Sequence, residues 1–427
     1  MPAPRPTRWL DSPDLSWARR LVVAVTAVGL LAVACSSGDS DQAQTTTTLP
    51  ANDTTTQPAT TLPATTTPKK IDTIPGMPPV VDPSDLYSET ESGKLSPAED
   101  GALTRVYVPN RASNTVSVID PSTMQVVDTF SVGLNPQHVV PSWDLETLWV
   151  TNNAEGTPDG TLTPIDPKTG KPGASVTVDD PYNMYFTPDG KSAINVAEAR
   201  KRLDFLDPHT MQLQSSLDVP QCGGINHADF SIDGRYVIFT CEFQGSLVKI
   251  DVVNKSVVGY LPLTQGGMPQ DIRSSPDGSV FYVAEMMRGG VYTIDPNAFT
   301  ETGFMPTGIG THGLYPSRDG KKLYVANRGS SRIGGPPGGP GSVSVIDFAT
   351  RAVTVNWPIP GGGSPDMGNV SADGKTLWLS GRYDDVVYAI DTTSGNVTKI
   401  PVGSEPHGLT VWPQPGRYSL GHTGNMR

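Results

Sequence analysis

A motif that recurs seven times constrains the fold of this chain more than any other feature of its sequence. Each copy is a stretch typical of a β-strand that ends in Asp, usually followed by a turn residue, at Asp120, Asp166, Asp207, Asp251, Asp295, Asp347 and Asp391. The intervals between copies run from 41 to 52 residues, and three of them are 44. A repeat of this length indicates one structural unit that is copied along the chain and stacked on its neighbours.

A second marker, Ser/Thr-x-Asp-Gly, accompanies the first and is typical of a tight turn. It occurs at residues 187–190, 231–234, 275–278, 317–320 and 371–374, with degenerate copies at 142–144 and 412–416. Between such turns each unit has β-branched and aromatic residues that predict four short strands. In the fifth unit these strands are expected at 311–317, 321–327, 341–347 and 351–357.

These patterns predict an all-β fold, a seven-bladed β-propeller with four-stranded blades. A four-stranded sheet cannot cover its own faces, and packing sheet on sheet around an axis solves that problem. Residues 104–132 supply three strands before the first inner strand, and residues 406–412 supply an inner strand with no outer strands after it. We therefore expect the two ends to complete one blade. The chain's 44 Gly and 41 Pro are poor in helix interiors and agree with this fold.

The first 34 residues have the layout of a secretory signal peptide. Arg19 and Arg20 precede an apolar run over 21–34, and small residues then lead to Cys35. This resembles the lipobox of bacterial lipoproteins, which implies that Cys35 becomes the lipidated first residue of an exported protein anchored to the outer side of a bacterial cell membrane. Two alternatives are an ordinary signal peptide with an incidental Cys and a twin-arginine export signal.

Residues 35–100 are predicted to tether the propeller, which is assigned to residues 101–427. Twelve threonines fall within residues 45–67, interrupted by prolines, and such a composition favours extended chain without a buried core. Residues 74–95 are less biased and include Leu86 and Tyr87. We expect this shorter stretch to pack on the propeller.

Three strand motifs carry a resemblance to a known family. They are Leu323-Tyr-Val-Ala-Asn327, Val106-Tyr-Val-Pro-Asn110 and Leu148-Trp-Val-Thr-Asn152. Over about residues 101–416 the chain resembles the YVTN-repeat family of seven-bladed propellers. The resemblance implies the fold and leaves the function open, because relatives include extracytoplasmic binding proteins, lactonases, streptogramin lyases and the haem-binding propeller of a nitrite reductase.

The first residues of the inner strands should line the mouth of the propeller channel. Aligning the seven units places these residues there: His138, Asn183, His227, Asp271, His312, Asp366 and His407. Imidazole and carboxylate groups suit zinc, copper or iron, and also acid-base chemistry, so the four histidines are candidate metal ligands. The alternative is a solvated polar channel whose ring nitrogens bind backbone or water.

A second ring of polar residues is expected from the loop after each second strand. It contains Asn110, Asn152, Glu198, Glu242, Glu285 and Asn327, and the arginines Arg111, Arg200, Arg288, Arg328 and Arg382. These arginines either pair with carboxylates and join neighbouring blades, or form a rim that binds anions through their forked donors.

Cys222 and Cys241 bracket the predicted hairpin of the third unit and fall almost opposite each other. In an exported protein this arrangement predicts a disulfide. No C-x-x-C-H motif is present, which excludes covalent c-type haem.

The sequence constrains function less than fold. A net charge of −12 opposes binding to nucleic acid, and no G-x-S-x-G, Walker or H-E-x-x-H motif supports a catalytic assignment. The favoured hypothesis is a monomeric, lipid-anchored binding module that uses its channel-mouth face to bind a cell-envelope protein or a small anionic ligand, and that touches the membrane only through its anchor. One alternative is a metal-dependent enzyme of the lyase, lactonase or oxidase type with a divalent or copper ion on the channel histidines. The other is a passive cell-envelope scaffold.

Overall fold

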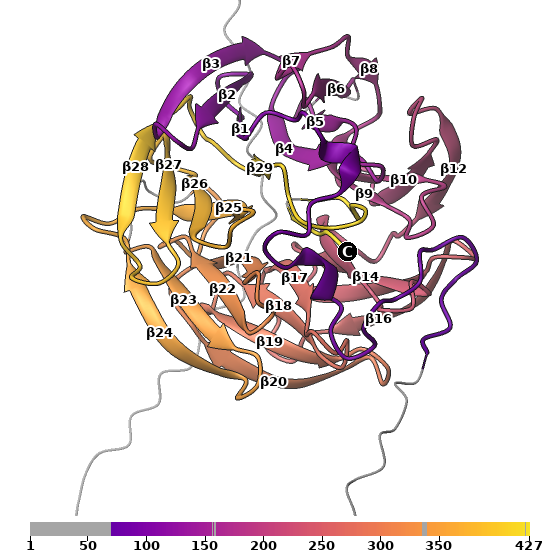
Figure 1. Ribbon diagram of the computed structural model, residues 1–427. Coiled ribbons are helices and arrows are strands. Elements are labelled where there is room, and N and C mark those ends of the chain that lie inside the picture. Colours follow the sequence, from indigo (N-terminus) through magenta and orange to yellow (C-terminus); the bar gives the residue numbers. More distant parts are fainter. Residues whose placement is uncertain (1–69, 156, 158, 335–339, 423) are drawn as a thin grey trace, which may run out of the picture. The chain divides into compact units, whose positions relative to one another are not determined.

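Each repeat unit forms one antiparallel sheet, and seven sheets stand around a common axis (Figure 1). The computed structural model describes residues 70–427 except 156, 158, 335–339 and 423. Within these residues, six sheets have four strands, and in the remaining sheet the outermost strand is split into two short pieces. The predicted all-β, seven-bladed propeller with four-stranded blades is confirmed.

The strands of each blade run from the channel outward in chain order, except in the blade that closes the ring. Blade one contains β4 (Pro136–Pro141), β5 (Leu148–Asn152), β6 (Thr161–Asp166), β7 (Lys171–Pro172) and β8 (Val176–Thr177). Blade two contains β9 (Pro181–Phe186), β10 (Ala193–Ala197), β11 (Arg202–Leu206) and β12 (Leu213–Asp218). Blade three contains β13 (Ile225–Phe230), β14 (Tyr236–Cys241), β15 (Ser246–Asp251) and β16 (Ser256–Pro262). Blade four contains β17 (Pro269–Ser274), β18 (Phe281–Glu285), β19 (Gly290–Asp295) and β20 (Thr300–Pro306). Blade five contains β21 (Thr311–Pro316), β22 (Lys322–Asn327), β23 (Ser342–Asp347) and β24 (Ala352–Pro358). Blade six contains β25 (Pro365–Val370), β26 (Thr376–Gly381), β27 (Val386–Asp391) and β28 (Val397–Pro401).

Blade seven is built from both ends of the propeller sequence. Its inner strand is β29 (Thr410–Trp412), and its outer strands are β1 (Arg105–Asn110), β2 (Thr115–Asp120) and β3 (Gln125–Ser131). β29 pairs antiparallel with β1, with Thr410 opposite Tyr107 and Trp412 opposite Arg105. The predicted closure of the ring by the two ends is confirmed.

The Ser/Thr-x-Asp-Gly turns close the hairpin between the first and second strands by the same hydrogen bonds in blades two to six. In blade three, Ser231 Oγ donates to Asp233 Oδ1 at 2.6 Å and accepts from the N–H of Tyr236 at 3.1 Å. Gly234 has a φ of 74°, which a residue with a Cβ adopts only at a steric cost. The same hydroxyl-to-aspartate bond recurs at 2.6 to 2.7 Å in blades two, four, five and six. The repeat in the sequence is thus a repeated turn.

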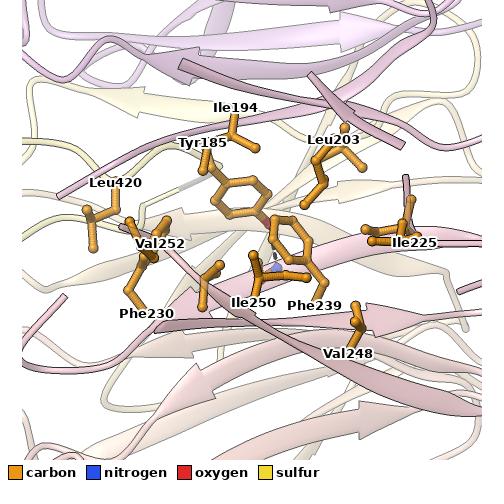
Figure 2. Packing of buried hydrophobic residues seen from close by; sticks show 14 of the residues in the cluster. Tyr185, Ile194, Leu203, Ile225, Phe230, Phe239, Val248, Ile250, Val252 and Leu420 are labelled. Carbon is orange, nitrogen blue, oxygen red and sulfur yellow. Dashed lines mark hydrogen bonds between the residues drawn. The ribbon is translucent and has the colours of Figure 1, made fainter. Parts of the chain in front are cut away.

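Buried apolar side chains fill the spaces between neighbouring blades, and Figure 2 shows the cluster between blades two and three. The rings of Tyr185 and Phe239 meet edge to face with centroids 5.5 Å apart. Tyr185 Oη accepts a hydrogen bond of 2.7 Å from the N–H of Ala228. Leu420, from the segment after β29, joins the same cluster. Each such fully buried side chain contributes about 1.5 to 3 kcal/mol.

We define the channel mouth as the end of the ring where the inner strands begin. Residues 70–100 lie across the opposite end. The N–H groups of Ile74 and Leu86 donate to backbone carbonyls in the turns of blades three and four. Ile74, Leu86 and Tyr87 are buried. Two short 3-10 helices follow, η1 (Ser88–Thr90) and η2 (Pro97–Glu99), the second with a capping box.

Residues 70–100, which the sequence assigns to the tether, thus pack on the propeller. Residues 74–95 pack on the propeller, as their composition indicates. The predicted signal peptide, Cys35 and the tether up to residue 69 lie outside the described residues. In the part of the chain that the structure describes, no helix has the length and apolar character needed to cross a membrane.

Cys222 and Cys241 form a disulfide, as the hairpin register indicates. We predict that the Cys222→Ala, Cys241→Ala double variant loses about 3 kcal/mol of stability, because the cross-link closes a loop of about 20 residues. Denaturation midpoints in urea would measure the loss. Wild-type protein that has been fully reduced should match the double variant, and an unchanged midpoint in both would contradict the prediction.

Candidate functional site

Seven residues in or just before the inner strands converge at the channel mouth, and their side chains are buried. Six are the second or third residue of an inner strand, and the last precedes β29. The residues are His138, Asn183, His227, Asp271, His312, Asp366 and His407. The structure therefore brings together the ring that the alignment of repeats predicts, including the four candidate ligand histidines.

A fifth histidine, His422, joins these four. The alignment of repeats did not predict it. Its ring centroid lies 4.6 Å from that of His227 and 5.1 Å from that of His138. His138 in turn lies 4.8 Å from His407, and His312 lies 6.1 Å from both His227 and His407. Five imidazoles thus form one continuous cluster on the axis.

His422 comes from residues 413–427, which turn back into the channel after β29. The N–H of His422 donates to the carbonyl of Met184 at 2.9 Å, and the N–H of Phe186 donates to Leu420 at 3.0 Å. Further along, the Arg427 guanidinium lies 2.6 Å from Asp229 Oδ1 and packs near the ring of Tyr87. In Figure 1 this yellow segment lies in the middle of the ring. It occupies the channel behind the histidine cluster.

Asn183 fixes two of the histidines by hydrogen bonds. Its Oδ1 accepts from the N–H of Met184 at 2.8 Å, which sets the orientation of the amide. Its Nδ2 lies 3.1 Å from His227 Nδ1 and 3.0 Å from His422 Nδ1. Because an amide nitrogen only donates, this pattern assigns the ring proton of both histidines to Nε2. His422 Nε2 points toward Asp271 Oδ1 at 3.7 Å.

On the other side of the cluster, Asp366 lies between two histidines. Its Oδ1 is 2.9 Å from His312 Nδ1, and its Oδ2 is 3.5 Å from His407 Nε2. Arg328, from the loop after β22, approaches Asp366 Oδ1 with Nη2 at 2.7 Å. One donor atom each from His312, Asp366 and His407 lie within 4.8 Å of one another, and the same holds for His138, His227 and His422.

Burial sets the protonation state of the cluster. It lowers the pKa of His138 to about 3 and that of His312 to about 4, and it holds the pKa values of His227, His407 and His422 well below the ordinary value. Burial alone would raise the pKa of Asp366, but Arg328 and the adjacent histidines hold it well below its usual value. At neutral pH the imidazoles are therefore neutral and Asp366 is ionised.

Several buried polar atoms in the cluster have no hydrogen-bond partner among the described residues. They are Nδ1 and Nε2 of His138, Nε2 of His227, Nδ1 of His312, Nδ1 of His407 and Oδ2 of Asp366. The contact of His312 with Asp366 is an ion-pair distance without hydrogen-bond alignment. An unsatisfied buried polar group costs about 1 to 3 kcal/mol, so this concentration of them at one place is a binding position for water, an ion or another ligand.

The second predicted ring divides into structural and unpaired members. Asn110, Asn152 and Asn327 are buried and donate to Ser or Thr hydroxyls on the third strand of their own blades. Arg111 pairs with Glu155 and Glu405, Arg200 with Asp179, and Arg328 with Asp366, while Arg288 donates to Gln265. Arg382 differs, because its Nη1 is buried without an acceptor. Most of the expected anion rim therefore joins parts of the propeller.

Two further acidic groups of the mouth, Asp271 and Glu242, are held by neighbours. Asp271 accepts from Arg273 Nη1 at 3.0 Å and from the N–H of Leu314 at 2.9 Å, although burial raises its pKa to about 6. Glu242 accepts from the side-chain amides of Asn226 and Gln270, both at 2.9 Å. These carboxylates serve as hydrogen-bond acceptors within the wall.

The pairing of Arg328 with Asp366 yields a stability prediction. We expect Arg328→Met to cost about 3 to 5 kcal/mol, because it leaves a buried carboxylate without its counter-ion. Arg200→Met is the matched control and should cost about 1 kcal/mol or less, because Arg200 and Asp179 are both partly exposed.

Denaturation midpoints of the two variants would measure the difference. An Arg328→Met, Asp366→Asn double variant should be more stable than Arg328→Met alone, since it removes the unpaired charge. Equal losses in Arg328→Met and Arg200→Met would contradict the prediction.

Comparison with known proteins supports the fold. Residues 62–212 match the model of a family described as YNCE-like beta-propeller. No curated protein matches the chain.

Solved structures resemble the chain over most of the propeller. Hydrazine synthase of Kuenenia stuttgartiensis is 18% identical, with a TM-score of 0.54 over 65% of this chain and 91% of that one. A putative 6-phosphogluconolactonase from Bacteroides uniformis is 16% identical, with a TM-score of 0.58 over 72% of this chain and 98% of that one. A second, from Bacteroides fragilis, is also 16% identical, with a TM-score of 0.57 over 73% and 98%. At these identities the likeness shows the fold alone, and the chain is a β-propeller protein.

Proposed function

We propose that this protein is an exported, lipid-anchored β-propeller that binds a transition-metal ion at its channel mouth, through His312, Asp366 and His407. The observation that carries the proposal is the convergence of one donor atom from each of these residues to within 4.8 Å of one another, in a fully buried position. Nδ1 of His312 and Oδ2 of Asp366 have no hydrogen-bond partner there.

The donors are in the state that metal binding requires. Ligating histidines must be neutral and ligating carboxylates ionised, and burial and Arg328 produce both conditions. Donors at about 2.1 Å from a tetrahedral ion lie about 3.4 Å apart. The 3.5 Å between Asp366 Oδ2 and His407 Nε2 already meets this spacing. Two histidines and one carboxylate suit zinc or iron, and His138 could supply a fourth nitrogen for zinc or copper.

The second group of histidines suits a metal less well. His227 and His422 each accept from Asn183 through Nδ1, so their Nε2 atoms carry hydrogen and offer no lone pair. Binding a metal there would require the Asn183 amide to leave both rings. We therefore assign His227 and His422 to the support of the channel wall, and not to the metal.

Metal uptake by the purified full chain tests the proposal. After dialysis against Zn(II) or Co(II) and removal of excess ion, wild-type protein should retain about one ion per chain, because the site has one set of free donors. A His312→Gln, His407→Gln double variant should retain none, with Gln chosen to preserve polarity. Elemental analysis gives the stoichiometry, and the visible absorption of Co(II) reports its ligands.

Two control variants sharpen that experiment. His209 is exposed and lies apart from the cluster, so His209→Ala should bind as wild type does. His227→Gln should also retain the ion, because its Nε2 carries hydrogen. Metal-free wild-type protein would contradict the proposal in favour of a solvated channel. Loss of metal in His227→Gln alone would assign the site to His138, His227 and His422 instead.

The lipid anchor rests on the sequence around Cys35 and has a separate test. In a bacterial host, the wild-type chain should partition into the detergent phase of a Triton X-114 extract. Cys35→Ala should leave the protein in the aqueous phase, because the lipidated residue is missing. Identical partitioning of the two proteins would contradict lipid anchoring and would leave the metal site unaffected.

A further inference from the structure

Arg382, at the channel mouth, has no carboxylate within ion-pair distance among the described residues, although its charge acts on the more distant Glu242. Arg382 follows β26 and is partly buried, and its Nη1 has no hydrogen-bond acceptor among the described residues. A desolvated guanidinium nitrogen is costly unless an acceptor meets it. The other four arginines of the predicted rim have acceptors, so this one is the exception among them.

The symmetry of the propeller shows where Arg382 points. Arg328 and Arg382 occupy the same place in blades five and six, directly after the second strand. In blade five, Arg328 crosses to the next blade and meets its inner-strand residue, Asp366. The corresponding residue for Arg382 is His407, in blade seven. The position that holds a carboxylate for Arg328 therefore holds an imidazole for Arg382.

The electrostatics agree with this placement. After burial, the charge of Arg382 is the largest influence that lowers the pKa of His407, and it also lowers those of His138 and His312. The guanidinium charge therefore lies near the histidines beside the proposed metal, and it acts on Glu242 and Tyr182 as well. A neighbouring aromatic ring, that of Tyr182, covers His138 and His407 with centroids 5.6 and 6.5 Å away.

We propose that Arg382 binds a small oxyanion at the channel mouth and that the same anion coordinates the metal held by His312, Asp366 and His407. This inference rests on the proposed metal site. The ligand class is a carboxylate or phosphate-like anion with at least two acceptor oxygens, one for the guanidinium fork and one for the ion. The anion supplies the counter-charge that Asp366, already paired with Arg328, cannot supply alone.

Titration with inorganic phosphate, and separately with acetate, tests the proposal on the full chain. Calorimetry is run on metal-free protein and on Co(II)-loaded protein, whose visible spectrum also reports a new ligand on the ion. At least one of the two anions should bind the loaded protein about tenfold or more tightly than the metal-free protein, and should shift the Co(II) bands. Tighter phosphate binding indicates a tetrahedral oxyanion, and tighter acetate binding indicates a carboxylate.

Variants assign the binding to Arg382. Arg382→Met should weaken anion binding by about tenfold or more, as expected for the loss of a hydrogen bond to a charged group, while Co(II) stoichiometry stays unchanged. Arg382→Lys should recover part of the affinity. Arg288→Met is the matched control, because Arg288 already donates to Gln265, and should bind as wild type does.

Three results would overturn the inference. Anion affinity that is unchanged in Arg382→Met would remove the residue from the site. Equal anion affinity in loaded and metal-free protein, without a spectral shift, would show that the anion does not coordinate the metal. Failure of both anions to bind would contradict the whole inference. If wild-type protein takes up no metal, the proposed function fails, and the metal-free titration alone then shows whether Arg382 holds an anion.

Discussion

The antiparallel pairing of β29 with β1 is the interaction on which the rest of the structure depends. Seven sheets bury both of their faces only when the ring is closed. This pairing joins the last inner strand to β1, the first strand in the sequence. It also fixes the chain on either side of β29. The residues before it place His407 at the axis, and those after it enter the channel and deliver His422. Closure of the ring and the placement of His407 and His422 therefore depend on the same strand.

Three buried acid–guanidinium pairs then govern the electrostatics of the channel. Arg328 pairs with Asp366 at 2.7 Å, Arg273 with Asp271 at 3.0 Å, and Arg427 with Asp229 at 2.6 Å. The first comes from a neighbouring blade, the second from the same strand and the third from the segment after β29. Such pairs add little net stability, but each member depends strongly on the other. In the first pair, Arg328 holds the pKa of Asp366 well below its usual value, beside imidazoles that burial keeps neutral.

Much of this arrangement could be predicted from the sequence, because the repeat fixes it. The spacing of the Asp-ended strands determines the blades, and the register within each blade places Asp366 and His407 at equivalent positions. His422 could not be found in this way, because it follows the last repeat, where no periodicity assigns a position. The only signal was a histidine between two glycines, Gly421 and Gly424, in a segment too short for another blade. The roles of the rim arginines could not be predicted from the sequence either, because each role depends on the residue that lies opposite the arginine in the folded ring.

The same dependence explains why a nearly symmetric ring differs between the two groups of histidines. Where a histidine of one group faces Asn183, the amide occupies its lone pair and the ring becomes part of the wall. Where His312 and His407 face Asp366, the carboxylate leaves an oxygen free and the lone pairs stay available. A divalent ion at that place would meet a carboxylate whose charge is already balanced by Arg328. The local charge would then be positive on both the ion and Arg382, and an anion between them is the arrangement that lowers the electrostatic energy.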